Sequence, residues 1–594
     1  MTPPGTVRAS RHRRACEEDS LDSPRAYAKA HRGVIAMAIT LALVGTGSAL
    51  VQPVAMAGIL STFETGAKVA GPLLLLAVVT LSEAVADGLQ RYLLHRTGAD
   101  LIRDVRTRFV PRALSWPFRE HARRGSGEIL TIATTDAQRL STLVISGLFE
   151  VFVAAITFLG ALIMMATISL TLLTITAGTV AVSLVVIVLI SGVTRRLARR
   201  SQERTAAMVA ELGASLDALS TLRAGRATKR CVERITSEVR AVRDIDVTLG
   251  RRVALIYPII GIATQTTFLV VLVCGGWLVS RGQLGLDQML AFLMYLFLLL
   301  MPMESGLRAI PVIQQARASW DRIRLALEVP TEDEHDQAVH GELLTRMPAD
   351  RPATATAISL RNVRFRYDQG PEVINGVDLD IRRGSRVALV GPSGSGKSTI
   401  LALLLRLFDA DSGSIRIDGI DVTRLQRDAV RAEMTYLEQQ APVVAGSIAH
   451  NLRLFAPESS DEELIHALKR VGLDHLLRRD GLASPVGEHG AALSGGERQR
   501  LALARTLLHP ASIVLMDEPT SQVDALTERL VLSVLTELPR DVTVVVVAHR
   551  LATITHFDQI VHLDQGVVTS RGTHSELLVH SDHYRSLAVM QAIA

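Results

Sequence analysis

The stretch Leu493-Ser494-Gly495-Gly496-Glu497-Arg498-Gln499-Arg500 decides the fold of the C-terminal part of the chain. Its backbone amides and its serine hydroxyl suit a nucleotide γ-phosphate. Two more phosphate motifs flank it, upstream Gly391-Pro392-Ser393-Gly394-Ser395-Gly396-Lys397-Ser398-Thr399 and downstream Ile513-Val514-Leu515-Met516-Asp517-Glu518.

The upstream motif has the form of a P-loop. It follows an apolar strand pattern at residues 386–390 and opens a predicted helix at 399–407. Its glycines let successive backbone amides converge on phosphate at a helix N-terminus. Lys397 adds positive charge beside the β- and γ-phosphates, and the Ser398 hydroxyl is placed to ligate Mg²⁺. A solvated glycine loop is the alternative, and the flanking strand and helix argue against it.

The downstream motif predicts a buried strand that ends in two carboxylates. Asp517 suits the shell of a Mg²⁺ ion, and Glu518 suits polarisation of an attacking water. A helix-capping role is the alternative for Glu518. A second apolar run, residues 544–548, predicts another buried strand that ends at His549, for which an ordinary core histidine is the alternative.

The three motifs, in this order, resemble the nucleotide-binding domain of ATP-binding cassette (ABC) proteins. The resemblance implies that ATP lies between the P-loop of one cassette and the 493–497 signature of another, so that the chain must dimerise. It also implies a hydrolytic role for Glu518, a γ-phosphate contact for His549 in a switch motif, and a D-loop at Asp524.

Two site residues come from the resemblance alone. Tyr367 matches the aromatic residue that stacks on adenine, and Gln439 matches the glutamine that senses Mg²⁺. Gln440 competes with Gln439 for this role, and residues 443–445 replace an aromatic residue usual in the family. Residues 484–490 resemble a loop specific to exporters.

The expected site therefore has four parts. The ATP-binding residues are Tyr367, Gly391, Pro392, Ser393, Gly394, Ser395, Gly396, Lys397, Ser398 and Thr399. The signature residues that reach the partner's ATP are Leu493, Ser494, Gly495, Gly496 and Glu497. The catalytic residues are Glu518, His549 and Gln439, and the Mg²⁺ residues are Ser398, Gln439 and Asp517.

Composition predicts a membrane domain before the cassette. Of the 594 residues 48% are hydrophobic, and the mean hydropathy is +0.28. Apolar runs of at least about 20 residues suit membrane spans. Six such runs lie at residues 33–60, 70–89, 143–168, 170–193, 253–279 and 286–310. Buried core helices are the alternative interpretation.

Charge placement favours spans. The segments before the first run and after the second and fourth are rich in arginine, whereas the opposite connections hold little more than Lys68 and Arg281. This bias predicts a multi-pass protein of the cytoplasmic membrane with both termini in the cytoplasm. It also accounts for the net charge of +5 without nucleic acid as a partner. Cys16, Cys231 and Cys274 have no metal-ligand spacing.

The predicted organisation is a cytoplasmic leader at 1–32, a transmembrane domain at 33–327, a linker at 328–357 and the cassette at 358–594. Long helical hairpins are expected in the cytoplasmic segments 90–140 and 194–252. Within them residues 127–130, Asp136 and residues 216–224 resemble parts of exporters that flank or form the coupling helices. Ala218 stands where exporters often carry glycine.

The fold class is thus multidomain, an all-α six-helix transmembrane domain followed by an α/β P-loop cassette. The implied function is ATP-driven export of a small molecule, lipid or peptide-like substrate by a dimer of half-transporters, either a homodimer or a heterodimer. An importer built on the same fold, for example for iron chelates, is the main alternative. A non-transporting ATPase is disfavoured by the six spans, and a ligand-gated channel by Glu518.

The sequence offers one candidate for cargo contact. Glu83 and Asp87 lie four residues apart in the second span and share a helix face. Carboxylates at membrane depth are costly unless they face water, a partner or a ligand. They attract cationic cargo in one interpretation, and are solvated or bridged to a polar neighbour such as Gln52 in the other.

Overall fold

A computed structural model describes residues 24–65, 68–340, 343–345, 347, 356–478, 480–487, 490–519, 525–548 and 550–593. The chain divides into two compact units. The first comprises Met1–Phe109 and Thr131–Leu325, and the second comprises Val110–Leu130 and Ala326–Ala594.

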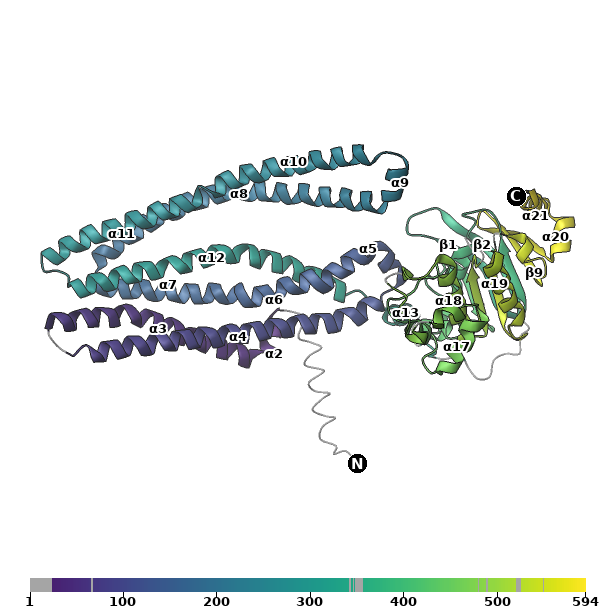
Figure 1. The fold of residues 1–594 in the computed structure, drawn as a ribbon, viewed down its shortest axis with the longest axis horizontal. Helices are drawn as coiled ribbons and strands as arrows, with labels where there is room; N and C mark the ends of the chain where they lie inside the picture. The colour runs from purple at the N-terminus through teal and green to yellow at the C-terminus, as the bar shows by residue number, and fades with distance from the viewer. Residues whose placement is uncertain are drawn as a thin grey trace, which may run out of the picture. The chain divides into compact units, whose positions relative to one another are not determined.

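The described part of the first unit consists of helices joined by short turns (Figure 1). Its helices, with the ends of α4 and α12 that reach the second unit, are α2 (Pro24–Ala30), α3 (Arg32–Thr65), α4 (Ala70–Leu114), η1 (Ile132–Asp136), α6 (Ala137–Ser146), α7 (Leu148–Ile168), α8 (Leu170–Asp217), α9 (Leu219–Ala224), α10 (Thr228–Val253), α11 (Ile256–Ser280) and α12 (Leu286–Leu327). Helix α2 falls within the predicted leader, residues 1–32.

The apolar helices coincide with the predicted spans. Among the described residues, three helical stretches are long and apolar enough to cross a membrane, namely Arg32–Phe63, Ala70–Leu114 and Phe118–Ile168. Three shorter apolar stretches, Leu170–Thr179, Thr264–Ser280 and Leu286–Leu299, lie in the predicted fourth, fifth and sixth spans. Large apolar side chains such as Leu74, Leu81 and Val85 are exposed on α4, as expected for a surface that faces lipid.

Helices α8 and α10 form a long hairpin that α9 closes (Figure 1). Helix α8 has 48 residues, which corresponds to about 70 Å at 1.5 Å per residue. Ala218 joins α8 to α9 with φ −94° and ψ 16°, so the chain turns there without glycine. The residues expected to resemble a coupling helix, 216–224, therefore lie at the tip of this hairpin.

A buried carboxylate ties two helical stretches of the first unit together. Asp136, at the end of η1, is fully buried. It accepts hydrogen bonds from Arg322 Nε at 2.8 Å and from Ser319 Oγ at 2.8 Å, both on α12. Asp136 thus holds η1 to α12 rather than forming part of a surface.

The second unit contains two sheets in its described part. One is antiparallel in the order β2-β1-β4-β5, and the other has the order β10-β9-β3-β8-β7-β6, parallel except for β10. The strands are β1 (Thr356–Arg366), β2 (Glu372–Arg382), β3 (Arg386–Val390), β4 (Ser412–Ile417), β5 (Ile420–Asp421), β6 (Met434–Leu437), β7 (Ile513–Asp517), β8 (Thr543–Val547), β9 (Gln559–Asp564) and β10 (Val567–Gly572).

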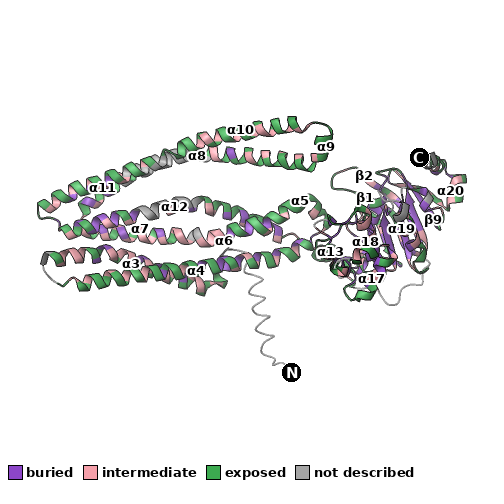
Figure 2. Ribbon diagram, in the orientation of Figure 1, coloured by how far each residue is buried: buried purple, intermediate pink, exposed green. Residues whose placement is uncertain are grey.

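Helices complete this unit. They are α5 (Phe118–Thr131), α13 (Glu332–His340), α14 (Lys397–Leu404), α15 (Arg427–Arg431), α16 (Ile448–Arg453), α17 (Asp461–Arg470), α18 (Gly495–Leu508), α19 (Ala525–Glu537), α20 (His574–His580) and α21 (Asp582–Ile593), with the short 3-10 turns η2 (Val422–Arg424), η3 (Asp474–Arg478), η4 (Gly481–Ala483) and η6 (Leu551–Thr553). Nearly all residues of the strands β3, β7 and β8 are buried. Figure 2 shows buried residues gathered on the strands of this unit.

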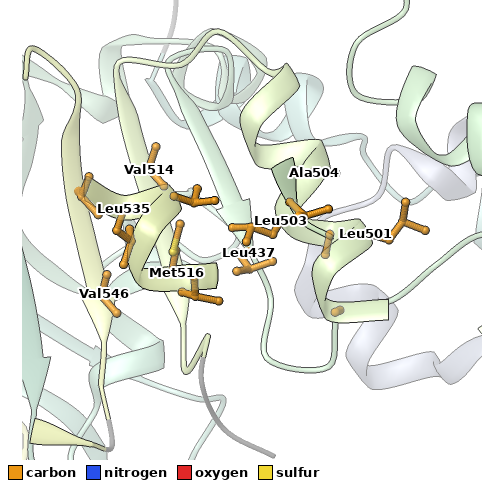
Figure 3. Close-up of a cluster of buried hydrophobic side chains, with 14 of the residues drawn as sticks. Leu437, Leu501, Leu503, Ala504, Val514, Met516, Leu535 and Val546 are labelled. Carbon is orange, nitrogen blue, oxygen red and sulfur yellow. The ribbon is translucent and has the colours of Figure 1, made fainter. Parts of the chain in front are cut away.

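One core cluster links two of the phosphate motifs. Leu501, Leu503 and Ala504 of α18 belong to the same cluster as Val514 and Met516 of β7 (Figure 3). Helix α18 begins directly after Ser494, and β7 ends in Asp517. The packing therefore fixes the signature helix and the carboxylate strand in one rigid body.

The predicted linker contains a helix that is bonded to the cassette. Three acidic residues occupy the first turn of α13, where the helix dipole favours negative charge. Asp336 is fully buried and pairs with Arg406 at 3.1 Å and with Arg427 at 3.0 Å. Glu332 pairs with Arg431 at 2.6 Å. Residues 332–340 thus form an ordered helix where the composition suggested a linker.

Residues 110–130 also belong to the second unit. Arg112 pairs with Glu334 at 2.7 Å, and the Phe118 ring meets the Phe408 ring edge-on at 5.6 Å. Contacts of this segment with the cassette thus include those of residues 112, 118 and 119. Helix α5 bends at Gly125, which has φ 71°.

Candidate functional site

The P-loop lies between β3 and α14, as the sequence predicts. Gly391 and Gly396 have φ of 150° and 99°, which glycine adopts at low cost. A Cβ on Gly391 would also collide with the carbonyl oxygen of Leu563, and one on Gly396 with the side chain of Ile374. These two glycines are therefore required by the backbone path itself.

The Lys397 side chain hydrogen-bonds to the backbone of the P-loop. Its Nζ donates hydrogen bonds to the carbonyl oxygens of Gly391 at 3.0 Å and Pro392 at 2.7 Å. Burial lowers the pKa of the Lys397 amine, and the nearby charges of Glu518 and Asp517 oppose that shift. An ammonium group is thus held over the phosphate cradle with two carboxylates close enough to influence it.

The carboxylate pair reaches the same cradle from β7. Ser398 Oγ donates a hydrogen bond to Asp517 Oδ1 at 3.0 Å. A hydroxyl and one carboxylate oxygen, side by side beneath a phosphate loop, match the few protein ligands that Mg²⁺ uses together with phosphates and water. The donor set fits the ion expected from the sequence.

Glu518 and Gln439 meet at the end of β7. Gln439 Nε2 donates a hydrogen bond to Glu518 Oε2 at 2.7 Å. Glu518 has φ 46°, a strained conformation for a residue with a Cβ, and such strain gathers at functional sites. The structure therefore brings together the proposed water-orienting carboxylate and the proposed Mg²⁺-sensing amide.

Tyr367 stands at the other side of the P-loop helix. Its hydroxyl lies 3.1 Å from Thr399 Oγ1, and its ring packs edge-on against Phe408 at 5.2 Å and Phe365 at 4.8 Å. The residue is 40% exposed. The fixed ring with an accessible surface suits stacking on a flat base. Phe408 supports this ring, and its isolated position in the sequence gave no signal.

The signature begins at an exposed helix N-terminus. Ser494 caps α18, and its Oγ accepts a hydrogen bond from Glu497 N at 3.3 Å, while the Glu497 carboxylate accepts one from Ser494 N at 2.8 Å. His475 Nε2 lies 2.7 Å from the other oxygen of Glu497. Free amides at a helix N-terminus favour an anion. The S-x-x-E spacing signals the capping box, but nothing local in the sequence points to His475.

His549 and Asp524 lie outside the described residues. The strand before His549 is described, and its β8 pairs in parallel with both β3 and β7. Ala548 N donates to Leu389 O at 3.0 Å, and Glu518 N donates to Val547 O at 3.1 Å. The strand β8 thus lies between the P-loop strand and the carboxylate strand.

The two acidic residues of α4 have polar partners. Gln52 Nε2 donates a hydrogen bond to Glu83 Oε2. Arg91 Nε donates to Asp87 Oδ2 at 2.8 Å, one turn along the same helix. The Gln52 bond is the bridge that the sequence analysis named as the alternative to cargo binding.

Two family models match the chain. That of the ABC transporter transmembrane region matches residues 35–303, and that of the ABC transporter matches residues 374–521. Among solved structures, a bacterial Atm1-family ABC exporter with ATP bound superposes with a TM-score of 0.77 at 27% identity, over 95% of this chain and 98% of that one. The exporter fold predicted from the sequence is confirmed.

Relatives of known name cover different shares of the chain. The mycobactin import ATP-binding/permease protein IrtB of Mycolicibacterium thermoresistibile is 38% identical over 321 residues, which are 54% of this chain and 53% of that protein. The putative multidrug export ATP-binding/permease protein YgaD of Bacillus subtilis is 25% identical over 569 residues, 94% of this chain and 95% of that protein. The match thus spans about half of the first relative and nearly all of the second. A membrane region and a cassette fused in this order place the chain in the ABC transporter family, with the architecture of an exporter-type half-transporter.

Proposed function

We propose that this chain is one half of an ATP-driven exporter of the cytoplasmic membrane, with both termini in the cytoplasm. The observation that carries the proposal is the contact between Gln439 and Glu518, 2.7 Å apart at the end of β7. This arrangement supplies a carboxylate to orient water and an amide to link it to the metal shell. It supports a cassette that hydrolyses ATP as well as binding it.

Each residue of the site has a defined part in this proposal. The P-loop amides and Lys397 hold the β- and γ-phosphates. Mg²⁺, held by Ser398 and Asp517 with the phosphates, would neutralise the charge that develops during transfer. Glu518 accepts a proton from the attacking water, while Gln439 keeps its carboxylate turned towards the site.

The signature of a second chain completes the site. Ser494 caps a helix, and both Ser494 and Gly495 at its N-terminus are exposed. The sequence carries every motif of a working site, so a homodimer with two equal sites is the simplest assembly, and a heterodimer with a related half is the alternative. ATP binding favours the closed pair of cassettes, and hydrolysis resets it.

An importer on the same fold is the second candidate. The observation that favours it is the 38% identity to the mycobactin importer, which exceeds the 25% identity to the putative multidrug exporter but covers a shorter stretch. An iron chelate is the corresponding cargo class. A small molecule, a lipid or a peptide-like compound is the cargo class of the exporter.

Transport direction and hydrolysis are tested in one experiment. The purified chain is placed in lipid vesicles, and ATP is added outside, so that only outward-facing cassettes are driven. An exporter accumulates a fluorescent hydrophobic cation inside the vesicles, whereas an importer releases preloaded radiolabelled ferric siderophore.

The Glu518→Gln variant should bind ATP but lose turnover by roughly 10²–10⁴-fold. Turnover near the parental rate would overturn the catalytic assignment.

A further inference from the structure

The signature serine is the last member of a chain of three polar side chains. Ser494 Oγ donates a hydrogen bond to Glu497 Oε2 at 2.7 Å. The other oxygen of the same carboxylate, Oε1, lies 2.7 Å from His475 Nε2. His475 belongs to η3, before the signature in sequence and outside it. The Ser494 hydroxyl, which is expected to contact the partner's ATP, is therefore hydrogen-bonded to the Glu497 carboxylate. The same carboxylate contacts His475 through its other oxygen.

We propose that His475 is a positioning residue for the signature, which sets how tightly Glu497 retains the Ser494 hydroxyl proton. The proposal rests on the proposed function, in which Ser494 donates to the γ-phosphate of the ATP held by the partner chain. That donation requires the hydroxyl to turn away from Glu497 Oε2. The strength of the Glu497 acceptor is then part of the free energy of closing the site.

Two further capping boxes in the same unit serve as internal comparisons. Ser460 and Glu463 cap α17, and Thr573 and Glu576 cap α20, with the same reciprocal bonds as at α18. In neither of these described boxes does a histidine ring hydrogen-bond to the glutamate carboxylate, although His580 Nδ1 lies 3.0 Å from the backbone carbonyl oxygen of Glu576. Capping a helix in this protein thus does not require a histidine behind the carboxylate.

The charge on Glu497 makes the arrangement sensitive to its partner. Burial alone would raise the pKa of Glu497, but the bonds from His475 and Ser494 outweigh it and lower the pKa to about 2. The carboxylate is thus ionised and shared between the ring and the serine. Hydrogen bonds with an ionised partner are roughly twice as strong as neutral ones. A second donor on Oε1 draws charge from Oε2, and it also fixes the rotation of the carboxylate.

When His475 is removed, Oε2 of Glu497 becomes a stronger acceptor and keeps the hydroxyl proton of Ser494. The Ser494 hydroxyl then donates a hydrogen bond to the γ-phosphate less readily. The hydrolysis step is not directly altered, because it depends on Glu518 of the chain whose P-loop holds the ATP. We therefore expect a higher ATP requirement with a nearly unchanged maximal rate.

The test is ATP titration of the ATPase activity of the full-length dimer in lipid. His475→Ala should raise the half-saturating ATP concentration about fivefold, as expected for loss of one typical hydrogen bond, and change kcat by less than about twofold. His475→Gln, which keeps an N–H donor, should restore most of the parental value. Glu463→Gln weakens the capping box of α17, whose residues lie outside the ATP site, and should leave the titration unchanged.

A double substitution tests whether His475 acts through the Glu497 carboxylate. In a Glu497→Gln background the acceptor is neutral, so adding His475→Ala should no longer shift the ATP requirement. The same fivefold shift in that background, a fall in kcat alone, or no shift at all would each overturn the proposal. Binding of a fluorescent ATP analogue to Glu518→Gln dimers with and without His475→Ala gives the same comparison without turnover. A parental protein that does not hydrolyse ATP would therefore count against the proposed function, while this binding comparison would still decide the role of His475.

Discussion

Replacing Asp336 by alanine tests whether α13 is an integral part of the cassette. The side chain of Asp336 has no exposed surface, and those of its partners Arg406 and Arg427 are 1% and 3% exposed. Arg427 approaches both oxygens of Asp336, with Nε at 3.2 and 3.1 Å. One fully buried carboxylate thus pairs with two guanidinium groups that solvent hardly reaches.

The expected loss of folding free energy depends on which contacts Arg406 and Arg427 keep after the substitution. Removing one partner of a buried ion pair costs about 3–5 kcal/mol, because a charge is left buried without its counterpart. Both arginines keep Asp409 as a partner. Arg427 also keeps the carbonyl oxygen of Arg406, and Arg406 keeps those of Val422 and Leu425. We therefore expect the lower end, about 3 kcal/mol. For a domain of the size of the cassette this corresponds to a fall in Tm of roughly 6–12 °C.

Scanning calorimetry of the purified full-length protein without nucleotide measures this shift. Glu537→Ala is the matched control, since it breaks the Arg470–Glu537 pair, in which the side chains are 32% and 57% exposed. Exposed pairs contribute about 0–1 kcal/mol, so the control should move Tm by only a few degrees at most. Equal shifts for the two variants would refute the view that α13 is anchored by buried charge.

Three further outcomes test the site and the membrane domain. Mixing a Lys397→Ala chain with a Ser494→Ala chain should restore up to one working site per mixed dimer, and no ATPase activity in verified mixed dimers would contradict composite sites. Glu83→Gln together with Asp87→Asn should lower transport of a cationic dye and spare a neutral one if the pair attracts cargo, whereas equal loss of both would assign the pair to the polar contacts of α4. Glu497→Gln should lower the Tm of the cassette at pH 7. Because the pKa of Glu497 is lowered from 4.5 to about 2, its carboxylate stabilises the fold above pH 4.5, so the difference in Tm between parent and variant should narrow as the pH falls from 4.5 towards 2.

Local patterns were sufficient for the strands that carry the site. The runs 386–390, 513–516 and 544–548 predicted strands, and the structure has β3, β7 and β8 within one residue of these bounds. Apolar runs of four or five residues between polar segments leave little choice in a parallel sheet, which is buried on both faces.

The helix after the P-loop was predicted less well. The pattern gave 399–407, whereas α14 is Lys397–Leu404. The helix starts early because Gly396, in a left-handed conformation, ends the loop directly at Lys397. It ends early because Arg406 has φ 50° and turns its buried side chain towards Asp336. The first reason is local, but the second involves a residue 70 positions away.

Long-range pairing accounts for the other differences. Residues 328–357 suggested a linker because they are acidic and then rich in proline and alanine. The acidic residues of α13 have partners distant in the sequence. Their partners, Arg406, Arg427 and Arg431, lie in the cassette. The contact between His475 and Glu497 spans 22 positions and likewise has no local signal. Motifs could thus name the residues that meet the nucleotide, but not those that hold them in place.

The C-terminal end of α4 is bonded to helix α13. It is a single helix of 45 residues, from Ala70 in the predicted second span to Leu114. Near its end Arg112 pairs with Glu334, and just beyond it the Ser115 carbonyl accepts a hydrogen bond from Glu332 N at 2.8 Å. Glu332 in turn pairs with Arg431 of the cassette. Helix α13 therefore joins the end of α4, at Arg112 and Ser115, to Arg431 of the cassette.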